Sequence, residues 1–300
     1  MRGLVVKSTG SHYMVQLETG QVVEARIKGR FRLQGIRTTN PLAVGDWVDV
    51  QGEQIVSIEQ RYNYIIRKAS NLSKESHILA ANVDEVFLFV TLYDPETPTE
   101  FVDRFLVSAK AYDVPVVLVI NKVDLLPHDD DYVEMYAHLY RSLHYPVVLC
   151  SVQTGQGLDE LKKRIAGKVV LLAGNSGVGK SSFINALDDR LNLKIGDISK
   201  AHRTGMHTTT YAEMYAVAGG KLIDIPGVKG FGLVDMDKYE IGHYFPEIFA
   251  AAKECKFGDC LHRNEPDCAV RRAVEEQRIS LSRYQSYVSI LDDVESGKYR

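Results

Sequence analysis

The sequence has few cysteines and no long apolar run, and these two shortages exclude several classes of protein. Only four cysteines occur in 300 residues, too few for a disulfide-stabilised secreted scaffold. The longest apolar run, residues 114–120, is far shorter than the roughly 20 residues that cross a bilayer. Residues 1–15 lack the sustained apolar core of a secretion signal. We therefore expect a cytoplasmic protein with no membrane partner.

An excess of positive charge is also missing. The formal net charge is −3, so the whole molecule is not a polycation that binds nucleic acid indiscriminately, and any RNA contact must come from local patches. A composition of 45% hydrophobic and 25% charged residues excludes a largely disordered or fibrous chain. Because domains usually span about 100 to 200 residues, we expect two or three compact units.

Three stretches of different pattern divide the chain. Residues 1–68 contain five short β-like runs, which predict an OB-fold-like RNA-binding barrel, with an SH3-like barrel as the alternative. In residues 69–234, apolar strands alternate with helical stretches, which predicts an α/β domain whose mostly parallel sheet is covered on both faces. Residues 235–300 carry a Cys/His cluster and then a long polar helix-like stretch, 269–293, so we expect a zinc-binding helical domain.

A phosphate-binding loop is predicted at residues 174–182. Residues 174–181 fit G-x-x-x-x-G-K-[ST] between an apolar strand, 169–173, and a helix-like run. Glycines let backbone N–H groups face phosphate oxygens, and the helix dipole and Lys180 add positive charge. Ser181 is expected to ligate Mg²⁺. A glycine-rich turn that binds no ligand, the alternative, would need neither Lys180 nor Ser181. The predicted phosphate-site residues are Gly174, Asn175, Ser176, Gly177, Val178, Gly179, Lys180, Ser181 and Ser182.

A guanine-recognition motif precedes this loop. Residues 121–124 follow the apolar strand at 114–120, where the carboxyl ends of α/β strands bind ligands. The carboxylate of Asp124 can accept hydrogen bonds from N1–H and the exocyclic amine of guanine, whereas adenine has no N1–H donor. The motif alone also fits a surface turn, but a nearby phosphate loop disfavours that reading. The predicted base-site residues are Asn121, Lys122, Val123 and Asp124, with Ser151 as a weaker candidate.

Two further elements are expected around the γ-phosphate. Residues 224–227 fit D-x-x-G, in which Asp224 binds Mg²⁺ through water and the Gly227 amide contacts the phosphate. In the His-Thr-Thr-Thr run at 207–210, Thr209 or Thr208 is the candidate Mg²⁺ ligand. A threonine run is also typical of the start of a β-strand.

The residue after D-x-x-G bears on hydrolysis. Ras-like enzymes place a Gln there to orient the attacking water, but this chain has Val228. An aliphatic side chain cannot hold water, so we expect slow intrinsic turnover and stimulation by a partner. His207 is the candidate catalytic residue, because an imidazole can both accept and donate a hydrogen bond. A solvent-facing His in the switch is an equally weighted alternative.

The order of these motifs differs from that of Ras-like GTPases, which begin with the phosphate loop. Here the guanine motif comes first, which predicts a circularly permuted P-loop GTPase domain. Permutation is tolerated where the original termini lie close together at the surface, because the site depends on spatial adjacency. The second switch then runs almost directly into the C-terminal segment.

A metal site is predicted near the C-terminus. Three thiolates and one imidazole within fourteen residues are the full ligand set of a closed, tetrahedral, structural Zn²⁺ site, and four protein ligands leave no position for catalysis. Buried small hydrophobes with an incidental His are the alternative. The predicted ligands are Cys255, Cys260, His262 and Cys268.

Two basic patches are candidates for RNA contact, since basic side chains and an interleaved aromatic suit phosphate contact and stacking. Solvated charged faces are the alternative. The barrel offers Arg26, Lys28, Arg30, Phe31, Arg32 and Arg37, and the C-terminal region offers His262, Arg263, Arg271, Arg272, Arg278 and Arg283.

Together these features resemble the ribosome small-subunit-dependent GTPase A family of bacteria. The resemblance covers the whole chain, including Phe-Pro-Glu at 245–247. It implies a GTPase that acts as a late maturation factor for the 30S subunit, with GTP, GDP, Mg²⁺ and 16S rRNA as ligands or partners. The family commonly has Arg where this chain has Met206, which puts the role of that Arg in doubt unless Arg203 substitutes.

Two other functions stay open, and we expect a monomer. One is an RNA-binding scaffold in which bound nucleotide only marks a state. The other is a permuted GTPase that acts on another RNA particle.

Overall fold

The computed structural model describes residues 1–9, 12–27, 41–68, 76–126, 131–191, 193, 212–225 and 236–296. Of the predicted site residues, His207, Thr208, Thr209 and Gly227 lie outside these ranges. Among the described helices, none has both the length and the apolar character needed to cross a membrane.

The N-terminal strands form a closed five-stranded barrel, as predicted. They pair in the order β1-β2-β3-β5-β4, and β4 pairs back with β1. Alternate residues of β2 point inward, and the core of the barrel is built from apolar side chains such as Val5, Tyr13 and Val15. The bounds are β1 Arg2–Ser8, β2 Tyr13–Leu17, β3 Val22–Ile27, β4 Trp47–Gln51 and β5 Gln54–Ile58.

The middle of the chain forms the predicted, mostly parallel sheet. Its strands run in the order β10-β9-β8-β11-β13-β12, and only β12 is antiparallel to its neighbour. Every residue of β8 and β9 is buried, because helices cover both faces, and this explains their continuous apolar sequences. The bounds are β8 Glu85–Val90, β9 Val116–Ile120, β10 Val147–Leu149, β11 Val169–Ala173, β12 Glu213–Val217 and β13 Gly220–Asp224.

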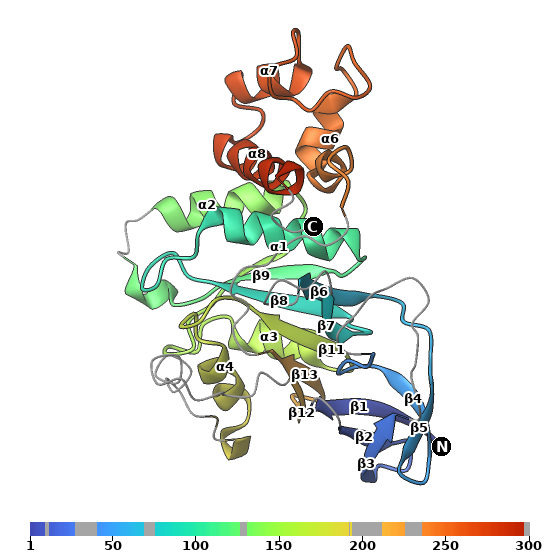
Figure 1. The fold of residues 1–300 in the computed structure, drawn as a ribbon. Coiled ribbons are helices and arrows are strands. Elements are labelled where there is room, and N and C mark those ends of the chain that lie inside the picture. The colour runs from blue at the N-terminus through green and yellow to red at the C-terminus, as the bar shows by residue number, and fades with distance from the viewer. Residues whose placement is uncertain are drawn as a thin grey trace, which may run out of the picture.

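The helices lie on the two faces of this sheet in pairs (Figure 1). One hydrophobic core joins the sheet to α1 and α2, and a second joins the opposite face to α3 and α4. The bounds are α1 Thr99–Ala111, α2 Asp131–Ser142, α3 Leu158–Ile165, α4 Lys180–Leu187, with the short 3-10 turns η1 Val123–Leu125 and η2 Asp189–Leu191.

Strand pairing continues from this sheet into the barrel. Strand β12 pairs with β1 as well as with β13, so a single sheet of eleven strands crosses both parts of the molecule. Between the two parts, β6 Tyr64–Lys68 and β7 Ser76–Ala81 form a separate two-stranded sheet. The barrel is therefore joined to the edge of the α/β sheet by backbone pairing.

The C-terminal helices pack into a third core. They are η3 Ile241–Tyr244, α6 Pro246–Ala252, α7 Ala269–Glu275 and α8 Leu281–Glu295. The prediction of one long polar helix over 269–293 is wrong. Gln277 adopts a left-handed conformation, and the N–H groups of Gln277 and Arg278 donate to the carbonyls of Val274 and Ala273, which ends α7 as a Schellman motif.

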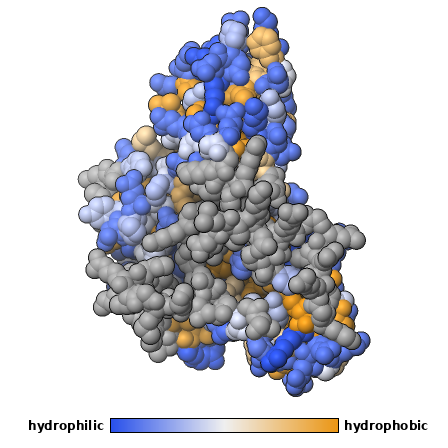
Figure 2. All heavy atoms as spheres, in the orientation of Figure 1, coloured by the Kyte–Doolittle hydropathy of each residue, from blue (hydrophilic) through white to orange (hydrophobic). Residues whose placement is uncertain are grey.

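Helix α8 is also less polar than predicted. Tyr287, Ile290 and Leu291 are buried in the third core, while hydrophilic residues make up much of the outer surface of these helices on the face shown in Figure 2. The third core includes Val107 of α1, so the C-terminal helices pack directly on the α/β domain.

Helix α1 is consequently buried on two sides, between the sheet and the C-terminal helices, and its polar residues need internal partners. Asp103 is fully buried and accepts hydrogen bonds from the Tyr140 hydroxyl at 2.9 Å and from Arg283 at 2.6 Å. The Arg283 guanidinium also donates to Glu247 of α6 at 2.7 Å and lies over the Phe245 ring. One arginine thus joins α1, α6 and α8.

Replacing this arginine should destabilise the docking of the C-terminal helices. Arg283→Met removes the guanidinium and leaves the carboxylates of Asp103 and Glu247 without this cationic partner. Removing one partner of a buried ion pair lowers the free energy of unfolding by about 3 to 5 kcal/mol. Thermal and urea unfolding of the full chain would measure the loss. Arg278→Met is the matched control, because Arg278 forms an exposed pair with Glu276, and its stability should stay close to wild type. Equal stability of the two variants would contradict the prediction.

Candidate nucleotide site and metal centre

The predicted nucleotide motifs meet at one edge of the sheet. Asn121 follows β9, Ser151 comes soon after β10, Gly174 follows β11 and Asp224 ends β13. These strands are parallel to one another through β8, so their carboxyl ends share an edge (Figure 1). Residues separated by about a hundred positions in the sequence are therefore neighbours.

Close backbone packing requires glycine at two positions of the phosphate loop. A Cβ atom on Gly174 would lie 2.3 Å from the carbonyl oxygen of Phe89, and one on Gly179 would lie 2.4 Å from Nδ2 of Asn121. Both residues also have positive φ angles, 136° and 98°, which disfavour residues with a side chain. The loop can therefore approach both β8 and the base motif only with glycine here.

The side chain of Lys180 points back into this loop. Its ammonium donates hydrogen bonds to the carbonyls of Gly174 at 2.7 Å and Asn175 at 2.9 Å. Burial lowers the pKa of Lys180 to about 8, while the charge of Asp224 opposes that shift. A buried ammonium above a glycine-rich loop and before a helix is suited to bind an anion such as a phosphate.

Asn121 connects the base motif to the phosphate loop. It is buried, and its Nδ2 donates a hydrogen bond of 2.8 Å to the carbonyl of Val178, 57 residues away. Its Oδ1 is buried without a protein partner, so this acceptor is available to a ligand or water. Asp124, in the 3-10 turn η1, is exposed at the same edge.

No sequence motif pointed to the loop after β8, yet it packs against both motifs. Lys122 donates a hydrogen bond from Nζ to the carbonyl of Asp94, and Pro95 lies beside Gly177. Hydrogen bonds between Thr91 and Thr97 close the loop. A polar residue directly after a buried apolar strand, here Thr91, is the signal that could have indicated this loop.

Ser151 shapes the second base loop. Its side chain is fully buried, its N–H donates to the Gln156 carbonyl at 3.0 Å, and its Oγ accepts a hydrogen bond from the Thr154 N–H at 3.1 Å. Because the Ser151 N–H is engaged within the loop, any backbone N–H offered to a base must come from another residue of this loop.

Asp224 has the features of a cation ligand. Its Oδ1 is buried and has no hydrogen-bond partner in the protein. Burial raises the pKa of Asp224, the neighbouring Glu213 adds to this shift, and the charge of Lys180 opposes it. An orphaned carboxylate oxygen near the start of α4, where Ser181 lies, fits Mg²⁺, which prefers a few protein oxygens and keeps several waters.

The four predicted metal ligands converge in the C-terminal domain. Their ligand atoms all lie within 4.8 Å of one another. Sγ of Cys268 is 3.9 Å from Sγ of Cys255, 3.8 Å from Sγ of Cys260 and 3.4 Å from Nδ1 of His262. A tetrahedron with Zn–S bonds of about 2.3 Å has edges of about 3.8 Å, so the cluster fits a zinc ion.

Burial also favours a metal at this cluster. It raises the pKa of the Cys260 thiol to about 12, so a bound cation is needed to keep that sulfur deprotonated at neutral pH. Burial lowers the pKa of His262, which keeps the imidazole neutral, the form that binds a metal.

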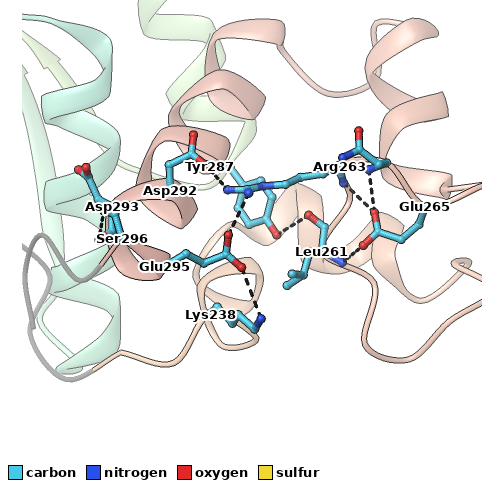
Figure 3. Close-up of polar contacts among 10 residues, drawn as sticks. Lys238, Leu261, Arg263, Glu265, Tyr287, Asp292, Asp293, Glu295 and Ser296 are labelled. Carbon is cyan, nitrogen blue, oxygen red and sulfur yellow. Dashed lines mark hydrogen bonds and ion pairs between the residues drawn. The ribbon is translucent and has the colours of Figure 1, made fainter.

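The loop that carries the cluster is fastened to α8 (Figure 3). The Arg263 guanidinium forms ion pairs with Asp292 at 2.5 Å and Glu295 at 3.0 Å, and the Tyr287 hydroxyl donates to the Leu261 carbonyl at 3.0 Å. Glu265 accepts hydrogen bonds from backbone N–H groups of the same loop. The ligands are therefore held in place from outside the cluster.

The structure changes the interpretation of the basic patches. In the barrel, only Arg26 is among the described residues, and it is exposed. In the C-terminal region, Arg271 and Arg272 are exposed, but Arg283 is buried, and Arg263 is ion-paired. Arg283 was wrongly predicted as a surface residue, because its two carboxylate partners are distant in the sequence.

Removing one zinc ligand should release the metal and unfold the C-terminal core. We expect one zinc ion per chain in wild type and none retained by Cys268→Ala, whose melting temperature should fall because metal binding and folding are coupled. Elemental analysis and thermal unfolding would measure both. Cys150→Ala is the matched control, since Cys150 is a buried free cysteine outside the cluster and should leave the zinc content unchanged. Unchanged zinc content in Cys268→Ala would refute the assignment.

Comparison with known proteins agrees with this arrangement. The family profile described as RsgA GTPase matches residues 58–234, and that of the RsgA N-terminal domain matches residues 2–55. A protein of Bacteroides fragilis (strain YCH46), named small ribosomal subunit biogenesis GTPase RsgA, is 55% identical, over 100% of this chain and 99% of its own. A protein of the same name from Porphyromonas gingivalis (strain W83) is 50% identical, with the same coverage.

Two crystal structures are also similar over nearly the full length. YjeQ from Thermotoga maritima is 36% identical with a TM-score of 0.74, covering 97% of each chain. YloQ, described as a circularly permuted GTPase, is 30% identical with a TM-score of 0.72, covering 98% of this chain and 95% of its own. The predicted permutation is therefore confirmed, and the chain belongs to the RsgA GTPase family of GTP-hydrolysing enzymes.

Proposed function

We propose that this chain hydrolyses GTP during biogenesis of the small ribosomal subunit. The observation that carries the nucleotide part is the hydrogen bond from Asn121 to Val178, which joins a guanine motif to a phosphate loop. The biogenesis part is supported by the names of relatives that are 50% or more identical over the full chain. The alternative of a scaffold that only binds nucleotide has no separate support.

In this proposal, Asp124 accepts the N1–H and amine hydrogen bonds of guanine, Asn121 holds the base motif against the phosphate loop through the Val178 carbonyl, and Lys122 covers the ring. The backbone of 174–179 and Lys180 hold the phosphates, and the Ser182 amide reaches the α-phosphate. Mg²⁺, when bound, neutralises charge on the β- and γ-phosphates. Its proposed protein contacts are Ser181, Asp224 and Thr209 or Thr208, with the Gly227 amide on the γ-phosphate.

Several finer assignments belong to the same proposal. They are the division into residues 1–68, 69–234 and 235–300, contact with 16S rRNA, and a monomeric state. The core of the barrel, whose members all lie within residues 1–68, and the C-terminal core, to which Val107 of α1 also belongs, support the division. The three-thiolate cluster favours a reducing compartment, which supports a location in the cytoplasm.

Changing one atom of the base-contacting carboxylate should change the preferred nucleotide. Asp124→Asn replaces one acceptor by a donor, which opposes the 2-amine of guanine but matches the 2-oxygen of xanthine. We expect GTP affinity to fall on the order of 100-fold and xanthosine triphosphate to bind better than GTP. Titration with both nucleotides would measure this. Asp159→Asn, on the exposed side of α3, is the matched control, and a GTP preference kept by Asp124→Asn would contradict the base assignment.

Stimulation by the small subunit tests both the partner and the catalytic residue. We expect slow GTP hydrolysis by wild type alone, because no Gln follows D-x-x-G to orient the water. Addition of 30S particles, and not of 50S particles, should accelerate it. His207→Ala should lose most of this stimulation, about 100-fold or more for a lost acid–base group, with GTP affinity retained. His138→Ala, an exposed histidine of α2, is the control. An unchanged stimulated rate in His207→Ala would eliminate that residue.

A further inference from the structure

Strand pairing brings a lysine of the barrel to the nucleotide edge of the sheet. Lys7 of β1 is paired with Glu213 of β12, and Glu213 is paired with Asp224 of β13. Directly paired residues of antiparallel strands lie on the same face, so these three side chains form a row. The row begins in the barrel and ends at the proposed Mg²⁺ ligand.

The row places one lysine beside two adjacent carboxylates. Nζ of Lys7 lies 3.0 Å from Oε1 of Glu213, and the Tyr215 hydroxyl donates to Oε2 of Glu213 at 3.4 Å. Glu213 and Asp224 are adjacent carboxylates on paired strands. The positive charge of Lys180, in the phosphate loop, compensates the negative charge of Asp224. The positive charge of Lys7, in the barrel, compensates the negative charge of Glu213.

The location of the Lys7–Glu213 ion pair is more important here than its contribution to stability. Both side chains are more than a third exposed, 38% and 37%, and exposed pairs contribute little to stability. Glu213 is, however, the first residue of β12, close to the site of a strongly anionic ligand. An uncompensated carboxylate there would repel a magnesium–nucleotide complex, which carries net negative charge.

We propose that Lys7 is a positioning residue for the nucleotide site: by neutralising Glu213 it removes a repulsive charge beside Asp224, so that the docked barrel strengthens nucleotide binding. This inference rests on the proposed assignment of Asp224 to the Mg²⁺ edge. Because Lys7 belongs to the barrel, a partner that draws β1 away from β12 would weaken nucleotide binding through this one charge.

The proposal is tested by nucleotide affinity in a double-mutant cycle. Lys7→Met should weaken binding of GDP with Mg²⁺ about three- to tenfold, a change that shrinks at high salt. Glu213→Gln should bind at least as tightly as wild type, and the Lys7→Met/Glu213→Gln double variant should match Glu213→Gln. Lys7→Arg, which keeps the charge, should match wild type. The control is Lys162→Met, which removes an exposed pair with Asp159 on α3.

Two results would overturn the proposal: unchanged affinity in Lys7→Met, or equal weakening in Lys7→Met and the double variant. If wild type itself binds no guanine nucleotide, the proposed function fails instead.

Discussion

The nucleotide edge of this protein depends on one hydrogen bond between two loops that are far apart in sequence, from Asn121 to the Val178 carbonyl. The bond is possible only because Gly179 has no side chain to displace the Asn121 amide. It fixes the distance between the part of the site that recognises a base and the part that holds phosphates. Circular permutation changes the order of these loops along the chain but not this contact, since parallel strands bring both to one edge.

The C-terminal domain is attached to the same architecture through α1. That helix follows the loop that touches Lys122 and Gly177, and its outer side forms part of the third core. Burying a helix on two sides requires that its charges be neutralised inside the protein, which Arg283 does for Asp103. The loop that carries the metal ligands packs on α8 through Arg263 and the Tyr287 hydroxyl, so this loop, α8 and the α/β domain form one connected body.

The barrel is attached at the opposite side of the molecule by a different kind of contact. Strand β1 extends the sheet through β12, so backbone pairing links the barrel to the strand next to Asp224, while Val44, before β4, is buried in the core shared with α1 and α2. The two flanking domains are therefore attached on opposite sides of the α/β domain, one through helix packing on α1 and one through a strand and an ion pair.

The sequence by itself determined the features whose chemistry depends on residue type and short spacing: Lys180 after its glycines, the four clustered metal ligands, and regular elements such as α3 and β11. The break within 269–293 escaped prediction because Gln277, neither Gly nor Pro, takes the left-handed conformation. Only the tertiary structure decided that Arg283 is buried and that Lys7 faces Glu213. Their partners lie 180 and 206 residues away, and the pairing of distant charges is set by packing and strand register, which local patterns do not encode.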